Sequence, residues 1–194
     1  MLYGFVVDLK SLVALAAQLD EKTFVEQHPD PGLIIRKKGR PAGDDQFDSE
    51  LDWRTRTNKA LYKGGAPPKK DPLAKLSFAP IVKSTRNPFS AMITVGRTPN
   101  NDVCLTFSSV SKLHAYFQNE NGRWAIRDSM SSFGTFVNGE KVPADTAVPI
   151  SDGALIGFGP DTECQFLTPS GLYAYLQRLG KDLEKPAKPD KPKA

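Results

Sequence analysis

The second half of the chain alternates apolar and polar residues with a period of two, the pattern of half-buried β-strands. The Asn138-Gly139 dipeptide stands between two such segments and is a strong signal for a tight hairpin turn. Alternating pairs recur along this half of the chain: Ile93 and Val95, Val103 and Leu105, and Trp124 and Ile126. The pattern from Leu73 to Thr168 therefore predicts an all-β sandwich of many short strands.

Two helical patterns flank this region. From Asp8 to about Gln27, apolar residues recur close to the spacing i, i+3, i+4, i+7, which predicts an amphipathic helix with a possible break near Asp20. A short apolar run, Leu33-Ile34-Ile35, follows it. At the other end, residues 169–183 predict a C-terminal helix, with these residues on one face: Leu172, Tyr175, Leu176 and Leu179.

Changes in composition divide the chain into parts. Residues 64–72 are so rich in Gly and Pro that they predict a linker, which places the sandwich at residues 73–168. Residues 1–63 then form an N-terminal extension that is marginal for a core of its own, so we expect its helix to dock onto the sandwich or onto another protein. Residues 184–194 alternate Lys and Pro, which predicts a solvated tail, or alternatively an electrostatic tether to an acidic partner.

The net charge, the cysteines and the lack of long apolar segments limit the expected partners and location of the protein. A net charge of +4 is only mildly basic, and the cluster from Arg36 to Arg40 lacks interleaved aromatic residues, so we expect no nucleic-acid partner. Cys104 and Cys164 both lie in predicted strands and are expected to be free thiols in a reducing compartment. No leading signal segment or long apolar stretch is visible, so we expect no membrane insertion and a cytoplasmic location.

One group of residues in the predicted turns suits an anion. Arg97 follows a strand and offers a planar fork of donors, Ser111-Lys112 offers a hydroxyl and a point charge, and Ser132 offers a second hydroxyl. Such a group can hold a phosphate without a metal, a cofactor, a base or a nucleophile, so we predict no cofactor and no catalysis. Arg97 could alternatively be a strand-end residue paired with Asp102.

The order and spacing of these residues resemble the forkhead-associated (FHA) domain family over roughly residues 73–168. The resemblance rests on these blocks: Gly96-Arg97, Ser111-x-x-His114, Asp128, Ser131-x-x-Gly134-Thr135 and Asn138-Gly139. It implies a sandwich of about eleven short strands, whose loops at one end bind phosphothreonine in extended peptides.

The resemblance also implies a role for each matching position. Arg97 and Ser111 would hold the phosphate, Lys112 would lie beside the phosphate or the peptide backbone, and Ser132 would add a further donor. The following residues would support the shape of the loops: Gly96, His114, Gly134, Thr135 and Asn138.

Phe133 departs from the family pattern. The family usually has Asn there, whose amide hydrogen-bonds the peptide main chain beside the phosphothreonine, whereas Phe has neither donor nor acceptor. Losing up to two hydrogen bonds of about 0.5–1.5 kcal/mol each predicts affinity that is weakened by about tenfold or more. Apolar contact between Phe133 and the ligand could offset that loss, so we expect altered binding.

The sequence therefore predicts a non-enzymatic adaptor in Ser/Thr kinase signalling. Its expected partner is a phosphorylated protein that presents a phosphothreonine segment made by such a kinase. The alternative is a phospho-independent scaffold or self-association domain that uses an apolar surface around Phe133.

Overall fold

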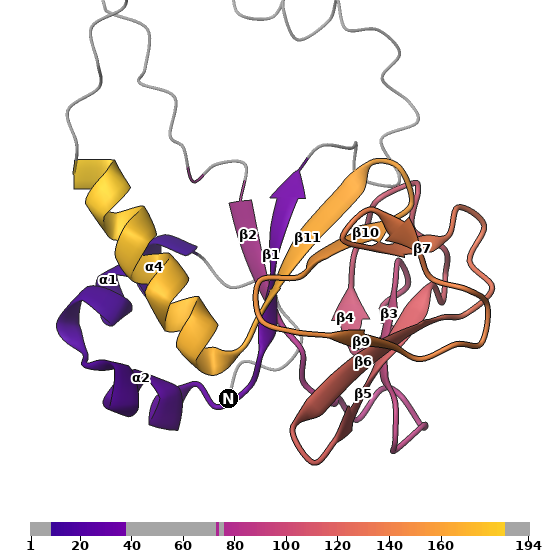
Figure 1. Ribbon diagram of the computed structural model, residues 1–194, viewed down its shortest axis with the longest axis horizontal. Helices are drawn as coiled ribbons and strands as arrows, with labels where there is room; N and C mark the ends of the chain where they lie inside the picture. The colour runs from indigo at the N-terminus through magenta and orange to yellow at the C-terminus, as the bar shows by residue number, and fades with distance from the viewer. Residues whose placement is uncertain (1–8, 38–72, 74–75, 185–194) are drawn as a thin grey trace, which may run out of the picture.

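A computed structural model describes residues 9–37, 73 and 76–184. In it the protein is a β-sandwich with a helical layer on one side (Figure 1). One sheet has six strands in the order β2-β1-β11-β10-β7-β8, and the other has five in the order β4-β3-β5-β6-β9. All neighbouring strands are antiparallel except β3 and β4. The predicted fold class, an all-β sandwich with N-terminal and C-terminal helices, is confirmed.

The strands are short, as the alternating segments predict. The six-stranded sheet comprises β1 (Gly32–Lys37), β2 (Leu76–Pro80), β7 (Thr135–Val137), β8 (Glu140–Lys141), β10 (Leu155–Phe158) and β11 (Thr162–Leu167). The five-stranded sheet comprises β3 (Ile93–Gly96), β4 (Val103–Cys104), β5 (Ala115–Glu120), β6 (Arg123–Asp128) and β9 (Val148–Ile150).

The main core lies between the two sheets and is built around aromatic rings. Phe117 of the five-stranded sheet faces Phe166 of the six-stranded sheet, with ring centroids 6.3 Å apart. Trp124 packs against the same ring at 5.9 Å. Cys164 is buried in this core and Cys104 is partly buried, and both are free thiols. Burial raises the pKa of the Cys164 thiol, which therefore stays protonated at neutral pH.

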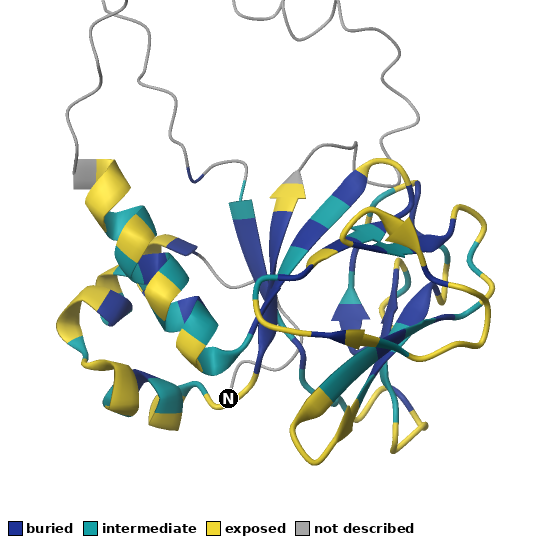
Figure 2. Cartoon of the chain, viewed as in Figure 1, coloured by how far each residue is buried: buried dark blue, intermediate teal, exposed yellow. Residues whose placement is uncertain are grey.

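Strand β1 belongs to the six-stranded sheet, although it comes from the segment that the sequence assigns to the N-terminal extension. It pairs with β2 on one side and with β11 on the other. Leu33 and Ile35 face the core between the sheets, whereas Ile34 faces the helical layer, so the strand is buried on both sides (Figure 2). A strand buried on both faces reads as a continuous apolar run, which gives no alternating signal.

The predicted division of the chain stays a prediction. The linker at residues 64–72 lies outside the described residues, as do residues 38–63 of the extension and the tail after residue 184. What the structure adds is that the sandwich includes a strand that precedes that linker.

The helical layer covers the outer side of β1 and β2. It consists of α1 (Leu9–Gln18), α2 (Glu21–Gln27) and α4 (Pro169–Glu184). The predicted break near Asp20 is confirmed, because its carboxylate caps α2 by accepting a hydrogen bond from the Thr23 N–H at 3.0 Å.

The first and last helices hold each other in place. Gln177 of α4 donates to the carbonyl of Ala16 at 2.6 Å, and the Tyr173 hydroxyl donates to the carbonyl of Leu19 at 3.0 Å. Their apolar sides form a second core with the outer face of the sheet: Leu9, Leu12, Ala16, Phe24, Ile34, Leu73, Phe78, Leu167, Leu172 and Leu176. None of the helices in the described part of the chain is long and apolar enough to cross a membrane.

The antiparallel arrangement gathers several loops at one end of the sandwich. β3 and β6 both pair with β5, which places the end of β3, the start of β5 and the end of β6 side by side. The turn between β10 and β11 reaches the same end, where the Gly159 N–H donates to the Gly134 carbonyl at 3.0 Å. This end therefore collects the β3–β4, β4–β5 and β6–β7 loops.

Candidate functional site

A pair of serine hydroxyls lies where these three loops meet. Ser111 on the β4–β5 loop and Ser132 on the β6–β7 loop have their Oγ atoms 3.4 Å apart, and the Ser132 N–H donates to Ser111 Oγ at 3.0 Å. The Arg97 N–H, on the β3–β4 loop, donates to the Ser111 carbonyl at 3.0 Å. The structure thus brings together three of the predicted phosphate-binding residues, although they are far apart in sequence.

The charged side chains around the pair are open to solvent. Arg97, Lys112 and Ser132 are exposed, and Ser111 is partly buried. Exposed cations beside two hydroxyls form a surface that offers donors and positive charge to an incoming anion.

The alternative pairing of Arg97 with Asp102 is absent from the contacts of the described residues. The Asp102 carboxylate is buried and accepts hydrogen bonds from the N–H groups of Ser84 and Thr94, each at 2.7 Å, and from the Asn87 amide. Burial raises the pKa of Asp102, but the hydrogen bonds from Asn87, Ser84 and Thr94 outweigh it, so this pKa is lowered overall. Asp102 therefore anchors β3 and the residues before it, and its ion pair is with Lys83 at 3.4 Å.

Gly96 is required because the β4–β5 loop crosses directly over it. A Cβ at this position would lie 2.2 Å from the Lys112 carbonyl oxygen, closer than any real contact. That carbonyl accepts hydrogen bonds from the Asn101 amide at 2.7 Å and from the Thr98 hydroxyl at 2.9 Å. These bonds fix the backbone of Lys112, whose side chain remains exposed. Sequence reasoning missed Asn101, because its surroundings signal only a turn.

His114 forms hydrogen bonds with both of the serine-bearing loops. Its ring is fully buried, and its Nδ1 accepts a hydrogen bond from the Ser111 N–H at 3.0 Å. The proton therefore lies on Nε2, which donates to the Gly134 carbonyl at 3.2 Å. Burial lowers the pKa of His114 and outweighs the Gly134 hydrogen bond and the Asp128 charge, so the ring is neutral at neutral pH. This histidine supports the loops, and it offers no free nitrogen for catalysis.

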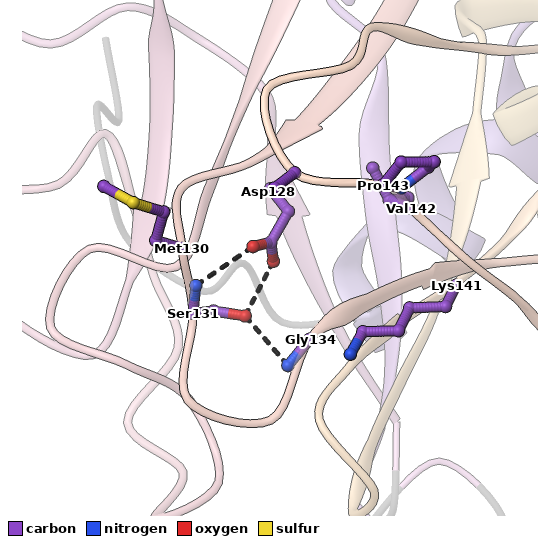
Figure 3. A pocket seen from close by; sticks show the side chains of 8 residues that line it. Asp128, Met130, Ser131, Gly134, Lys141, Val142 and Pro143 are labelled. Atoms are coloured by element: carbon purple, nitrogen blue, oxygen red, sulfur yellow. Dashed lines mark hydrogen bonds between the residues drawn. The ribbon is translucent and has the colours of Figure 1, made fainter.

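Asp128 organises the β6–β7 loop (Figure 3). Its carboxylate accepts hydrogen bonds from the Ser131 hydroxyl at 2.6 Å, the Ser131 N–H at 3.0 Å and the Thr135 hydroxyl at 2.7 Å. Ser131 Oγ in turn accepts the Gly134 N–H at 2.9 Å. Burial raises the pKa of Asp128, but these hydrogen bonds lower it by more, so the carboxylate stays ionised. Sequence reasoning did not assign this role to Ser131, although its spacing of three residues from Asp128 is typical of such a turn.

Asn138 lies away from the serine pair. It stands in the β7–β8 hairpin turn with φ of +51°, and the following Gly139 has φ of +89°, as a tight Asn-Gly turn requires. Its side-chain oxygen accepts the Leu155 N–H at 2.9 Å, which ties the hairpin to β10. Asn138 thus supports the sheet at the opposite end of β7 from the serine pair.

Phe133 and Met130 are exposed on the β6–β7 loop. Phe133 directly follows Ser132, and its ring points into solvent rather than into either core. Met130 adopts φ of +51°, a left-handed conformation that residues other than Gly, Asn and Asp seldom adopt. The loop therefore presents two exposed apolar side chains within two residues of Ser132.

A hollow of about 480 Å³ borders the same loop. It is lined by Asp128, Met130, Ser131, Gly134, Lys141, Val142, Pro143 and Ala144. In Figure 3 the Lys141 side chain runs toward Gly134, whereas Met130 points away from it. The hollow therefore lies next to the site but outside the serine pair.

Comparison with known proteins shows what this region is similar to. Residues 93–159 match the FHA domain. An FHA domain-containing protein of Arabidopsis thaliana is 32% identical over 71 residues, which are 36% of this chain and 18% of that protein. The chain thus spans about a fifth of the length of this curated relative.

Two solved structures are similar to part of the chain. Mycobacterium tuberculosis EmbR in complex with a low-affinity phosphopeptide is 32% identical, with 40% of this chain and 20% of that chain covered and a TM-score of 0.37. The FHA domain of a hypothetical protein of Arabidopsis thaliana is 29% identical, with 40% and 66% covered and a TM-score of 0.38.

Proposed function

We propose that this chain, whose residues 93–159 form an FHA domain, is a non-enzymatic adaptor that binds phosphothreonine segments of partner proteins. The observation that carries this proposal is the pair of hydroxyls at Ser111 and Ser132, 3.4 Å apart, with the backbone of the exposed residue Arg97 hydrogen-bonded to that of Ser111.

The chemistry of the site suits a phosphate ester. A phosphorylated threonine brings about −1.5 to −2 charges and three acceptor oxygens at neutral pH. Two hydroxyls, the guanidinium of Arg97 and the ammonium of Lys112 supply matching donors and charge. The two buried carboxylates, Asp102 and Asp128, accept hydrogen bonds from neighbouring loop and strand residues. These internal bonds leave the exposed donors available for a ligand.

Several finer features belong to the same proposal. The ligand is a product of a Ser/Thr kinase, and the adaptor works in the cytoplasm within such a signalling pathway. Phe133 replaces an amide that would contact the peptide main chain, so binding is about tenfold weaker than with Asn unless apolar contact compensates.

Titration of a degenerate phosphothreonine library, alongside its unphosphorylated twin, tests this function. We expect only the phosphorylated library to bind. The unphosphorylated peptides lack the phosphate that would pair with the exposed donors at Arg97, Lys112 and Ser132. Fluorescence anisotropy of labelled libraries measures the difference. Equal binding of the two libraries, or binding of neither, would rule the proposed function out.

A second function is favoured by one observation. Phe133 is 56% exposed directly after Ser132, and a large apolar side chain there also suits a phospho-independent scaffold or self-association surface. Under this alternative the unphosphorylated library binds as well as the phosphorylated one, or the chain forms a dimer that Phe133→Ser disrupts.

A further inference from the structure

The outer face of the six-stranded sheet is only partly covered by the helical layer. The second core, beneath the helices, includes Ile34 of β1, Phe78 of β2 and Leu167 of β11, and none of its members in the described residues lies on β10, β7 or β8. These three strands follow β11 in the sheet, and β10 and β7 lie away from the helices (Figure 1). Their outer face therefore lacks the cover that the helices give to the other half of the sheet.

Three residues on this uncovered face form an apolar strip. On β10, Ile156 and Phe158 belong to the main core, so Leu155 and Gly157 face outward. Phe136 of β7 lies opposite Gly157 and belongs to neither core. Leu155 is 40% exposed, whereas Phe136 and Gly157 are partly buried. We refer to Leu155, Gly157 and Phe136 as the outer strip.

No contact within the described residues requires a glycine at position 157. Gly157 lies inside β10 and is not among the glycines with a positive φ. A Cβ at this position would lie 3.4 Å from the Cβ of Phe136, an ordinary van der Waals contact, and farther from every other neighbour. Glycine weakens a strand and provides no side chain to pack, so inside a strand it often marks the close approach of another segment. Gly157 therefore points to a contact on the outer strip.

A segment of the same chain starts and ends beside this face. Residues 38–75, of which only Leu73 is described, join the end of β1 at Lys37 to the start of β2 at Leu76. β10 is two strands from β1, which is about 10 Å at the usual strand spacing. Trp53 lies 16 residues after Lys37, a length of chain that can span roughly 50 Å. The segment is therefore long enough to reach the outer strip.

The composition of residues 44–53 suits an apolar surface. Phe47, Leu51 and Trp53 lie within seven positions of one another in this stretch. The C-terminal tail, residues 185–194, contains only Lys, Pro, Ala and Asp, so it offers no large apolar side chain. Between these two parts of the chain, residues 44–53 are therefore the better match for the outer strip.

The charges of the two surfaces also match. Residues 44–53 contain no basic side chain and five acidic ones: Asp44, Asp45, Asp48, Glu50 and Asp52. On the outer face of the sheet, Lys141 of β8 lies opposite Phe136 and is exposed. An acidic segment laid across the strip would therefore place carboxylates beside a cation, which favours one orientation of docking.

We propose that residues 44–53 of the same chain dock on the outer strip. The ring of Trp53 would pack over Gly157, where the strip has no side chain, and the acidic residues of the segment would face Lys141. The docked segment would extend the cover of the six-stranded sheet from β11 to β7. This interaction goes beyond the proposed function and does not depend on phosphopeptide binding.

Photo-cross-linking from position 155 of the full chain tests the docking. p-Benzoylphenylalanine replaces Leu155 in one preparation and Leu113, which is 41% exposed, in the control. Leu113 lies on the β4–β5 loop, at the end of the sandwich where β1 ends, so the tethered segment can reach it as easily. Because docking raises the local concentration of the segment, position 155 should link to residues 44–53 at least about fivefold more often than position 113. Mass spectrometry of the irradiated monomer measures the two yields.

Trypsin cleavage at Arg54 and Arg56 gives an independent readout, because docking would protect the backbone next to Trp53. Gly157→Glu places a charged side chain on the strip, where it would also repel the acidic segment, and should speed this cleavage by about tenfold. The control is Ala125→Glu. Ala125 is also partly buried and faces outward from β6 in the other sheet, since the next residue in that strand is in the core. The control should leave the cleavage rate unchanged.

The outcomes separate the possible occupants of the strip. Links from position 155 to residues 44–53 within one chain support the inference. Links to residues 1–8 or 185–194 instead, links only between two copies of the chain, or equal yields at positions 155 and 113 would overturn it. Cleavage that Gly157→Glu leaves unchanged, or that Ala125→Glu speeds as much, would also overturn it. Neither experiment includes a phosphopeptide, so a failure here leaves the proposed function standing.

Discussion

Replacing Arg97 by alanine should weaken phosphothreonine-peptide binding by roughly tenfold to a hundredfold. Arg97 is exposed and its backbone adjoins Ser111, and a hydrogen bond to a charged group contributes about 1.5–3 kcal/mol. Arg97 contacts its neighbours through backbone groups that alanine retains: its N–H donates to the Ser111 carbonyl, and its carbonyl accepts a hydrogen bond from the Cys104 thiol at 3.6 Å. The free energy of unfolding should therefore change little while the affinity falls. Isothermal titration of one phosphopeptide measures the effect.

Arg123→Ala is the matched control for this substitution. Arg123 is also exposed, and it begins β6, whose other end at Asp128 carries the β6–β7 loop. The control removes the same charge from the opposite end of the sheet, so it separates a direct contact from a general electrostatic attraction. An equal loss of affinity in both variants, or no loss in Arg97→Ala, would contradict the assignment of Arg97 as a phosphate ligand.

Replacing His114 by alanine should lower the free energy of unfolding by about 3 kcal/mol. The substitution leaves a cavity and leaves two buried backbone groups, the Ser111 N–H and the Gly134 carbonyl, without their partner. Because these groups belong to the two serine-bearing loops, phosphopeptide affinity should fall as well. Urea denaturation followed by tryptophan fluorescence measures the loss of stability.

His28→Ala provides the comparison. His28 is only partly buried at the end of α2, where its backbone N–H caps the helix and its ring lies 4.8 Å from that of Phe24. Its removal should cost less than about 1 kcal/mol, since no buried polar group loses a partner. If His114→Ala is no more destabilising than His28→Ala, His114 does not join the loops as described.

Much of the fold follows from patterns that the sequence displays openly. The period of two at Ile93 and Val95 corresponds to a strand with one face on the core, and the break at Asp20 corresponds to a helix cap. Strand β1 could not be predicted from alternation of apolar and polar residues. Leu33, Ile34 and Ile35 are all buried, so the run has no period, and its partner β2 begins only at Leu76.

The site was less predictable than the fold, because it depends on how loops cross. Family resemblance places Arg97, Ser111 and Ser132 in one site, and the structure brings them together. The resemblance could not reveal that the Asn101 amide donates a hydrogen bond to the carbonyl of Lys112. That bond joins two loops, and the spacing of the two residues in the sequence carries no signal of it. The left-handed backbone of Met130 is equally invisible in the sequence, because methionine has no preference for it.

The most direct measurement of the central claim is the set of backbone amide shifts in a ¹H–¹⁵N NMR titration with a phosphothreonine peptide. The account predicts that the largest changes fall on Arg97, Ser111 and Ser132, and that the unphosphorylated peptide produces none of them. Changes centred instead on the helical layer of α1 and α4, or identical changes with both peptides, would contradict it.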